Sequence, residues 1–242
     1  MRTRIPVLNI LIDNVTMNEA VGIIENFIKK KTPHLIATAN AEMVMMAQAD
    51  EELSQILNQA DLVVPDGAGV VWAARYQGYI MPERVAGYDL TQRLLAKAAD
   101  KGYRIYIFGS APGIAEKAKE AAAKSFPGLQ IVGIRNGFFT NQDEYNIVDD
   151  IKACCPDILL VALGVPKQEK WLSAHLKQLN IPVAIGIGGT LDVMAGMVQR
   201  APLWMQQANL EWLFRLLSQP RRAIRMLALP RFIIRILFGK KY

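Results

Sequence analysis

Short apolar runs alternate with longer amphipathic segments along residues 1–196. The apolar runs place Val, Ile and Leu on successive positions, which predicts strands buried on both faces. The amphipathic segments have the periodicity of helices that cover a core. The predicted strands are residues 35–38, 62–64, 104–108, 129–134, 158–163 and 183–187. The predicted helices are residues 17–30, 41–58, 67–75, 90–101, 115–124, 144–153 and 167–179.

The order of these elements predicts the fold class. Strands separated by helix-length segments favour a mainly parallel sheet with helices on both faces, which is a doubly wound α/β fold. Residues 1–15 differ from this pattern and predict an edge hairpin that ends at Asp13 and Asn14.

Residues 197–242, which we call the appendage, differ from the rest of the chain in charge. They hold nine basic residues and one acid, Glu211, for a net charge of +8, whereas residues 1–196 hold 19 basic and 21 acidic residues, for −2. Such asymmetry indicates a main body with a cationic extension that meets nucleic acid, anionic lipid or a phosphorylated ligand. A basic face that is merely solvated would give the same pattern.

The appendage is also rich in apolar residues. Pro220 and Pro230 interrupt it, so we expect two or three short helices, each basic on one side and apolar on the other. This composition is typical of helices that lie on a membrane surface rather than cross it. The alternative is that the apolar faces dock on the body or on another subunit, as in a homo-oligomer.

Composition narrows the class of protein further. The chain has 242 residues, 52% hydrophobic and 21% charged, which excludes disorder as its main state. The sequence has no 18-residue apolar run and no secretory signal, so we expect a cytoplasmic protein. The only cysteines, Cys154 and Cys155, are adjacent, which favours neither a disulfide framework nor a zinc site.

Polar and glycine-rich segments follow the predicted strands, where ligands bind in parallel α/β sheets. Asp66 follows the second of these strands, in the place of a general base, although Asp at a helix start is often only an N-cap. Thr38 and Asn40 follow the first strand and could likewise cap the next helix. Gly188 and Gly189 permit close approach of a ligand to backbone amides that suit an anion.

Several motifs of phosphate and hydrolase chemistry are missing from the sequence. There is no P-loop lysine, no G-x-S-x-G and no H-E-x-x-H, and residues 109–113 lack the third glycine of a dinucleotide loop. An Asp-x-Asp pair that would hold a metal ion against a diphosphate is also missing. We expect Arg215, Arg222 and Arg225 to neutralise such a ligand instead, because forked guanidinium donors match phosphate oxygens.

Eight segments, taken in order, carry a resemblance to a known family. They are ATANAEMVMMAQ, LVVPDGAGVVWAAR, PERVAGYDL, GLQIVGIRNGFF, LLVALGVPKQEKW, IGIGGTLDVMAG, RAPLW and LEWLFRLLSQPRR. Together they resemble the WecG/TagA/CpsF glycosyltransferase family, and its TagA branch most. The resemblance covers nearly the whole chain and implies a Rossmann-like catalytic core in residues 1–196 with a helical C-terminal appendage in residues 197–242.

The resemblance also implies an activity. The TagA branch transfers N-acetylmannosamine from UDP-N-acetylmannosamine to the 4-hydroxyl of N-acetylglucosamine on undecaprenyl diphosphate, for wall teichoic acid linkage units. The transfer is inverting and needs no metal or other cofactor. The appendage would be both a lid on the active site and a contact with the inner face of the cytoplasmic membrane. UDP-N-acetylmannosaminuronic acid, or another UDP-sugar for a surface polysaccharide, is the alternative donor.

Carried over by position, the resemblance implies roles for individual residues. Asp66 would be the general base, and Arg215, Arg222 and Arg225 would close over the diphosphate. The implied substrate-binding residues are Thr38, Asn40, Gln168 and the nearby Arg84 around the sugar, and Asn136, Gly137, Phe138, Gly188, Gly189 and Asp192 around the uridine.

Two other classes of protein are the alternatives to a glycosyltransferase. A Rossmann-type oxidoreductase needs a better glycine fingerprint and an acidic ribose-binding residue about 20 residues further on, which the sequence lacks. A non-enzymatic module would use the cationic appendage to bind a membrane or nucleic acid. For the glycosyltransferase we expect no nucleic-acid partner.

Overall fold

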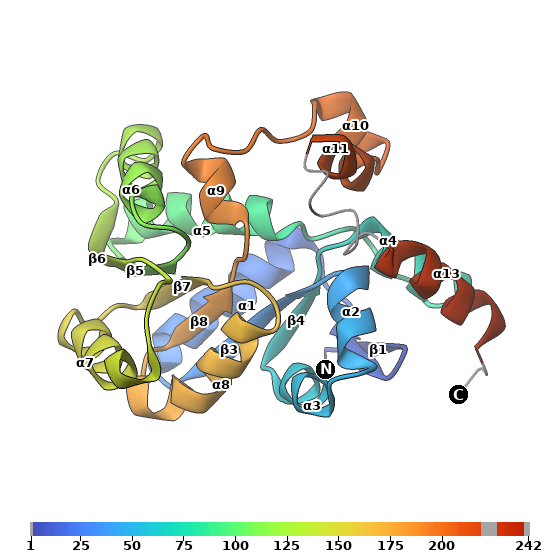
Figure 1. The fold of residues 1–242 in the computed structure, drawn as a ribbon, viewed down its shortest axis with the longest axis horizontal. Coiled ribbons are helices and arrows are strands. Elements are labelled where there is room, and N and C mark those ends of the chain that lie inside the picture. The colour runs from blue at the N-terminus through green and yellow to red at the C-terminus, as the bar shows by residue number, and fades with distance from the viewer. Residues whose placement is uncertain (1, 219–226, 240–242) are drawn as a thin grey trace.

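A six-stranded parallel sheet forms the centre of the molecule in the computed structural model, which describes residues 2–218 and 227–239 (Figure 1). The strand order is β4-β3-β8-β7-β5-β6, and each neighbouring pair is parallel. The strands are β3 (His34–Ala39), β4 (Leu62–Pro65), β5 (Arg104–Gly109), β6 (Gln130–Arg135), β7 (Ile158–Ala162) and β8 (Val183–Gly186). All six predicted strands are present, with ends that differ by at most one residue.

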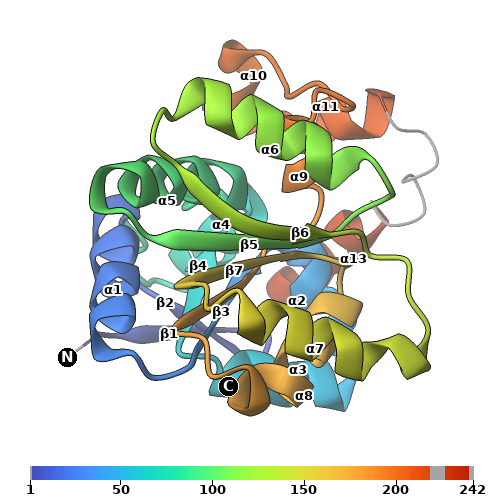
Figure 2. The same cartoon turned by 90° about the vertical axis from the view of Figure 1, so that its left-hand side faces the viewer.

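Helices cover both faces of the sheet, and Figure 2 shows α5 and α6 on the opposite side of the strands from α7 and α8. Successive residues of β5 enter different cores: Ile107 packs in one and Phe108 in the other. The predicted doubly wound α/β class is therefore confirmed. The helices of this part of the chain are α1 (Met17–Lys30), α2 (Ala41–Ala47), α3 (Glu51–Gln59), α4 (Ala68–Tyr76), α5 (Gly87–Lys101), α6 (Ile114–Ser125), α7 (Glu144–Ala153) after a 3-10 turn at Asn141–Asp143, α8 (Lys167–Leu179) and α9 (Thr190–Met194).

The N-terminal hairpin forms, but as a sheet of its own. Strands β1 (Arg4–Val7) and β2 (Ile10–Asp13) pair antiparallel and do not extend the main sheet. The fully buried carboxylate of Asp13 attaches the hairpin to β4 by accepting the N–H of Val63 at 2.7 Å. It also forms ion pairs with Arg2 and Arg4.

The single helix predicted over residues 41–58 is wrong, because two helices occupy this range. Helix α2 ends at Ala47, and α3 begins at Glu51. The break has a local cause: the side chain of Asp50 caps α3 by accepting the N–H of Leu53 at 3.0 Å. Asp at an N-cap position competes with continuation of the preceding helix. Helix α5 also begins three residues earlier than the predicted residue 90.

The appendage is helical in the part that the structure describes. The described part contains α10 (Leu203–Gln207), α11 (Glu211–Ser218) and α13 (Ala228–Phe238), of which α10 has no basic residue, unlike the basic helices expected. Helix α13 packs beside α2 and α4 through the fully buried ring of Phe232 (Figure 1). Within the described residues, no helix has the length and apolarity needed to span a bilayer.

Candidate active site

Three adjoining cavities lie where the carboxyl ends of the strands meet α11. The sheet-side cavity is lined by residues that follow β3, β4, β7 and β8, among them Thr38, Asp66, Gln168 and Gly188. The helix-side cavity lies between the first turns of α2 and α4 and the appendage. A smaller loop cavity lies beside residues 198–201. Glu211 and Arg215 line all three cavities, so the appendage completes each of them.

Asp66 follows β4 and lines both the sheet-side and the helix-side cavity. Its Oδ1 accepts the N–H of Gly87 at 2.8 Å, at the first residue of α5. The carboxylate therefore caps a helix, but that helix is α5, whereas α4 has Gly67 as its N-cap residue and no side-chain cap. Burial raises the pKa of Asp66, against the opposing effects of Arg84, of the Gly87 hydrogen bond and of Arg215.

Polar residues at the carboxyl end of β3 also line the sheet-side cavity. Thr38 is buried, and its hydroxyl donates to the carbonyl of Gly186 on β8 at 3.3 Å, which ties together the ends of two strands. Asn40 caps α2 by accepting the N–H of Met43 at 3.0 Å. Capping by Asn40 is thus confirmed, and it fixes a side chain that also lines the sheet-side cavity.

Gln168 supports the glycine-rich floor of the sheet-side cavity. Its Oε1 accepts the N–H of Gly164 at 3.2 Å and that of Gly188 at 3.1 Å. Gly188 has φ +49°, in the left-handed region, and Gly189 follows it along the cavity wall. The fully buried amide of Gln168 therefore holds the turns after β7 and β8 in register.

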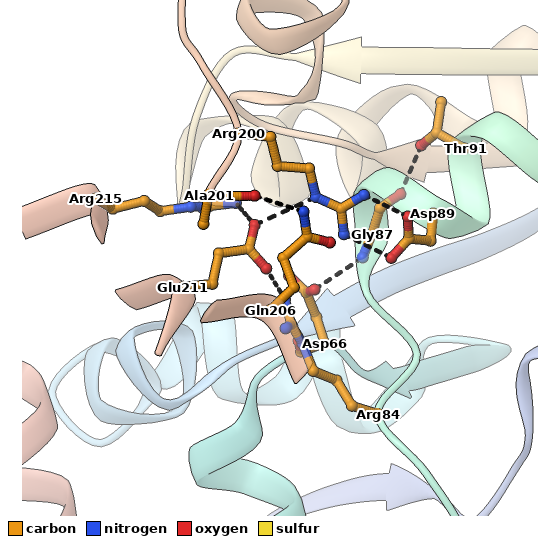
Figure 3. Close-up of polar contacts among 10 residues, drawn as sticks. All are labelled: Asp66, Arg84, Gly87, Asp89, Thr91, Arg200, Ala201, Gln206, Glu211 and Arg215. Atoms are coloured by element: carbon orange, nitrogen blue, oxygen red, sulfur yellow. Dashed lines mark hydrogen bonds and ion pairs between the residues drawn. The ribbon is translucent and has the colours of Figure 1, made fainter. Parts of the chain in front are cut away.

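Arginine side chains from the core and the appendage meet at Glu211 (Figure 3). Arg84 Nε donates to the carbonyl oxygen of Asp66 at 2.6 Å, and its Nη2 donates to Glu211 at 2.8 Å. Arg215 Nη2 donates to the other oxygen of Glu211 at 3.2 Å. Arg84 thus lies directly beside Asp66, and Arg215 joins it from α11.

The residues expected around the uridine are only partly brought together. Asp192 lines the loop cavity, and its Oδ1 accepts the hydroxyl proton of Ser110 at 2.9 Å. Asn136, Gly137 and Phe138 line none of the three cavities. Gly137 reaches this region only indirectly, by donating its N–H to the carbonyl of Ser110 at 2.8 Å. A role of these three residues in uridine binding therefore stays a prediction.

The structure describes only one of the three arginines that were expected to contact the diphosphate. Arg222 and Arg225, expected to contact the diphosphate, lie outside residues 2–218 and 227–239, so only Arg215 of the three arginines is placed. Over those same ranges, no group of three or more His, Cys, Asp or Glu residues is arranged to hold a metal ion.

Sequence reasoning assigned no role to Glu169, although it stands beside Gln168 in the GVPKQEKW segment. Its carboxyl is almost fully buried, and Oε1 accepts the Gln168 amide at 2.8 Å. Oε2 has no hydrogen-bond partner among the described residues. Burial raises the pKa of Glu169 to about 7, although the hydrogen bond from Gln168 opposes the rise.

Glu169 should make the stability of the chain depend on pH. Because its pKa is higher in the folded state, its favourable contribution is complete below pH 4.5 and is lost as the pH rises through 7. We expect the free energy of unfolding to fall by up to about 3 kcal/mol over this range. Glu169→Gln should remove the part of the fall that Glu169 causes, as measured by urea unfolding at pH 5 and pH 8, whereas Asp66, whose pKa is also raised by burial, keeps its own part. The exposed Glu120→Gln is the matched control, and an undiminished fall in Glu169→Gln would contradict the assignment.

The fold is that of many α/β enzymes, and its cavities at the carboxyl ends of the strands are lined by both carboxylates and arginines. Residues 5–241 match the family described as "Glycosyl transferase WecG/TagA/CpsF family". The chain belongs to this family, and it is a glycosyltransferase.

Curated relatives cover most of this chain. The proteins of Bacillus spizizenii W23, Bacillus subtilis 168 and Staphylococcus aureus MW2 are 38%, 34% and 31% identical to it, over 84%, 90% and 98% of its length and 78%, 84% and 94% of their own. All three are named N-acetylglucosaminyldiphosphoundecaprenol N-acetyl-beta-D-mannosaminyltransferase.

Proposed function

We propose that the chain transfers N-acetylmannosamine from UDP-N-acetylmannosamine to the 4-hydroxyl of N-acetylglucosamine on undecaprenyl diphosphate, with inversion and without a metal ion. The acceptor and the sugar are those in the names of its relatives. The observation that carries the proposal is the placement of Asp66, which lines two cavities beside Arg84 and Arg215. As the family resemblance implies, the product would begin a wall teichoic acid linkage unit.

The donor fits the sheet-side cavity in this proposal. Thr38, Asn40 and Gln168 would contact the sugar, while Gly188 and Gly189 would leave room for the nucleotide beside backbone N–H groups. The uridine would extend toward Asp192 in the adjoining loop cavity. The acceptor would enter by the helix-side cavity, where Trp212 and Leu229 provide apolar surface for its lipid.

Asp66 would be the general base of the transfer. Its carboxylate takes the proton of the acceptor hydroxyl, the oxygen forms a bond to the anomeric carbon, and the bond from that carbon to the diphosphate breaks with its electron pair on UDP. Attack from the face opposite UDP inverts the anomeric centre. The raised pKa of Asp66 makes it a stronger base than an exposed aspartate.

The charge that develops on the leaving diphosphate would be stabilised by guanidinium groups. Arg215 already borders the sheet-side cavity. Arg222 and Arg225 follow it in the sequence and would complete the set. Preorganised cations beside a leaving group lower the barrier in the way that a bound metal ion does elsewhere. Residues 197–242 would thus act as a lid on a core of residues 1–196.

The appendage would also hold the enzyme on the inner face of the cytoplasmic membrane. Helix α13 buries Phe232 and Ile236 against the core and exposes Ile233, Ile234, Leu237 and Phe238, the last of them 82% exposed. Arg231 and Arg235 are exposed on the same helix. Apolar side chains in the acyl boundary with arginines at phosphate headgroups are typical of interfacial helices. Formation of a homo-oligomer stays a prediction.

Replacing Ile234 and Phe238 with Glu should release the chain from membranes. We expect binding to anionic vesicles to weaken about tenfold or more, because two exposed apolar side chains that would enter the bilayer become charged. Co-flotation with vesicles measures the bound fraction. Tyr145→Glu, on the exposed surface of α7, is the matched control. Equal flotation of both variants and the unmodified chain would remove α13 from the membrane contact.

The direct test of the function is a product assay. The chain is offered UDP-N-acetylmannosamine, UDP-N-acetylmannosaminuronic acid and UDP-N-acetylglucosamine, each with an N-acetylglucosamine-diphospho-lipid analogue. We expect product from the first donor, with its anomeric centre inverted, and an unchanged rate in EDTA. Product from the uronic acid alone would support the alternative donor, and no product from any donor would refute the proposal.

A further inference from the structure

Glu211 is the only acid of the appendage, and it is buried. It is the first residue of α11, is 5% exposed and lines all three cavities. An acidic residue in the first turn suits the helix dipole, but that effect needs no burial and no partner. The surroundings of Glu211 therefore need a separate explanation.

Three arginines from different segments surround this carboxylate (Figure 3). Arg84 comes from the segment between α4 and α5 and lies 2.8 Å from Oε2. Arg215 lies one turn further along α11, 3.2 Å from Oε1. Arg200 approaches Oε1 at 3.6 Å and is held mainly by Asp89 of α5, at 2.6 and 2.7 Å. Glu211 thus joins core and appendage at one point.

The electrostatics require the carboxylate to be charged. Burial alone would raise the pKa of Glu211, but the hydrogen bond from Arg84 and the charges of the arginines outweigh burial and lower it. Without this charge, Arg84 and Arg215 would face each other across the cavity with like charges. Removing one member of a buried ion pair leaves the other uncompensated and free to move away.

Arg84 and Arg215 both line the two cavities that Asp66 lines. Arg84 also donates to the carbonyl oxygen of Asp66, so its orientation is set from two sides. Arg215 contacts Glu211 through Nη2, and a guanidinium has further N–H donors in the same plane for a second partner. Glu211 can therefore orient Arg215 without occupying all of its donors.

We propose that Glu211 is a positioning residue: it holds Arg84 and Arg215 in place beside Asp66, so that docking of α11 and assembly of the cationic diphosphate site are one event. The inference rests on the proposed function, because it takes Arg215 as the partner of the donor's diphosphate. Glu211 is thus an acidic residue in a site where the groups that would bind the diphosphate are cationic.

The test measures UDP binding by calorimetry, together with kcat/KM for sugar transfer. Glu211→Gln keeps the shape of the side chain and removes its charge, and we expect UDP affinity and kcat/KM each to fall about tenfold. In an Arg215→Gln background the same change should have a smaller effect, because one of the two arginines that it positions is gone. A purely structural role would lower both quantities by the same factor in either background.

Two further variants are controls for this test. Asp89→Asn weakens the ion pair between Asp89 and Arg200, which also joins core and appendage. Because Asp89 does not contact Arg84 or Arg215, kcat/KM should stay within about twofold. Glu211→Asp keeps the charge and shortens its reach, and should give an intermediate loss if Glu211→Gln does not fold.

The outcomes separate this inference from the proposed function. Failure of the unmodified chain to bind UDP or to transfer the sugar would refute the proposed function. If the unmodified chain does both and the Glu211 variants match it, or if the effects of Glu211→Gln and Arg215→Gln multiply, the positioning role is refuted while the function stands.

Discussion

Asp66→Asn should lower kcat at least about 100-fold while leaving UDP affinity within about twofold. An amide cannot take the proton of the acceptor hydroxyl. Its oxygen can still accept the N–H of Gly87, so the start of α5 keeps its cap and the cavity keeps its shape. Initial rates of sugar transfer and UDP calorimetry on the same preparation separate chemistry from binding.

The matched control for Asp66→Asn is Asp61→Asn. Asp61 is also an aspartate that accepts a backbone N–H, that of Leu35 at 2.9 Å, but this contact lies at the opposite end of β3 from the cavity. We expect normal turnover in the Asp61 variant. Turnover at the unmodified rate in Asp66→Asn would remove Asp66 from the mechanism.

Arg215→Gln should lower kcat/KM about 100-fold, because the developing charge on the diphosphate loses a preorganised donor. Arg215→Lys should recover only part of the loss, since an ammonium lacks the planar fork of a guanidinium. Steady-state rates over a range of donor concentrations give both values. Arg93→Gln, an exposed arginine on α5, is the control.

A point substitution is a sharper test of the lid than removal of residues 197–242. Phe232 of α13 is fully buried against the core, so truncation would uncover apolar surface as well as remove cations. An Arg215→Gln variant that keeps normal kcat/KM would contradict the role of α11 in catalysis.

Much of the fold follows from local pattern. Runs of Val, Ile and Leu such as residues 158–163 predict a doubly covered strand because both faces must be apolar. The sequence does not predict the break between α2 and α3, because the amphipathic pattern continues through it and only the capping geometry of Asp50 interrupts the helix. Asp50 is visible in the sequence as a possible cap, but so are many other Asp residues.

The sequence predicts which strand ends form the site, but it does not predict which contacts the residues at these ends make. The rule that ligands bind beyond the carboxyl ends of parallel strands placed Thr38, Asp66 and Gly188 together correctly. That Asp66 would cap α5 rather than α4 depends on how residues 77–86 return to β4, which no local pattern encodes. Asn136 lies after a strand end too, yet β6 is at the sheet edge and its loop does not reach the cavities.

Glu211 stands out in the sequence by its charge, but its partners do not. A single acid among nine basic residues stands out, but its partner Arg84 is 127 positions away in the chain. Pairing over such a distance becomes visible only when the appendage is seen docked on the core.

The central claim is that the cavity at Asp66 binds a nucleotide-sugar and that α11 supplies cations to its diphosphate. A crystal structure of the chain with UDP tests this most directly. The account predicts UDP along Gly188 and Gly189, with its diphosphate in contact with the Arg215 guanidinium and its terminal phosphate facing Asp66. UDP bound away from this cavity, or bound in it without contact to any arginine of residues 197–242, would contradict the account.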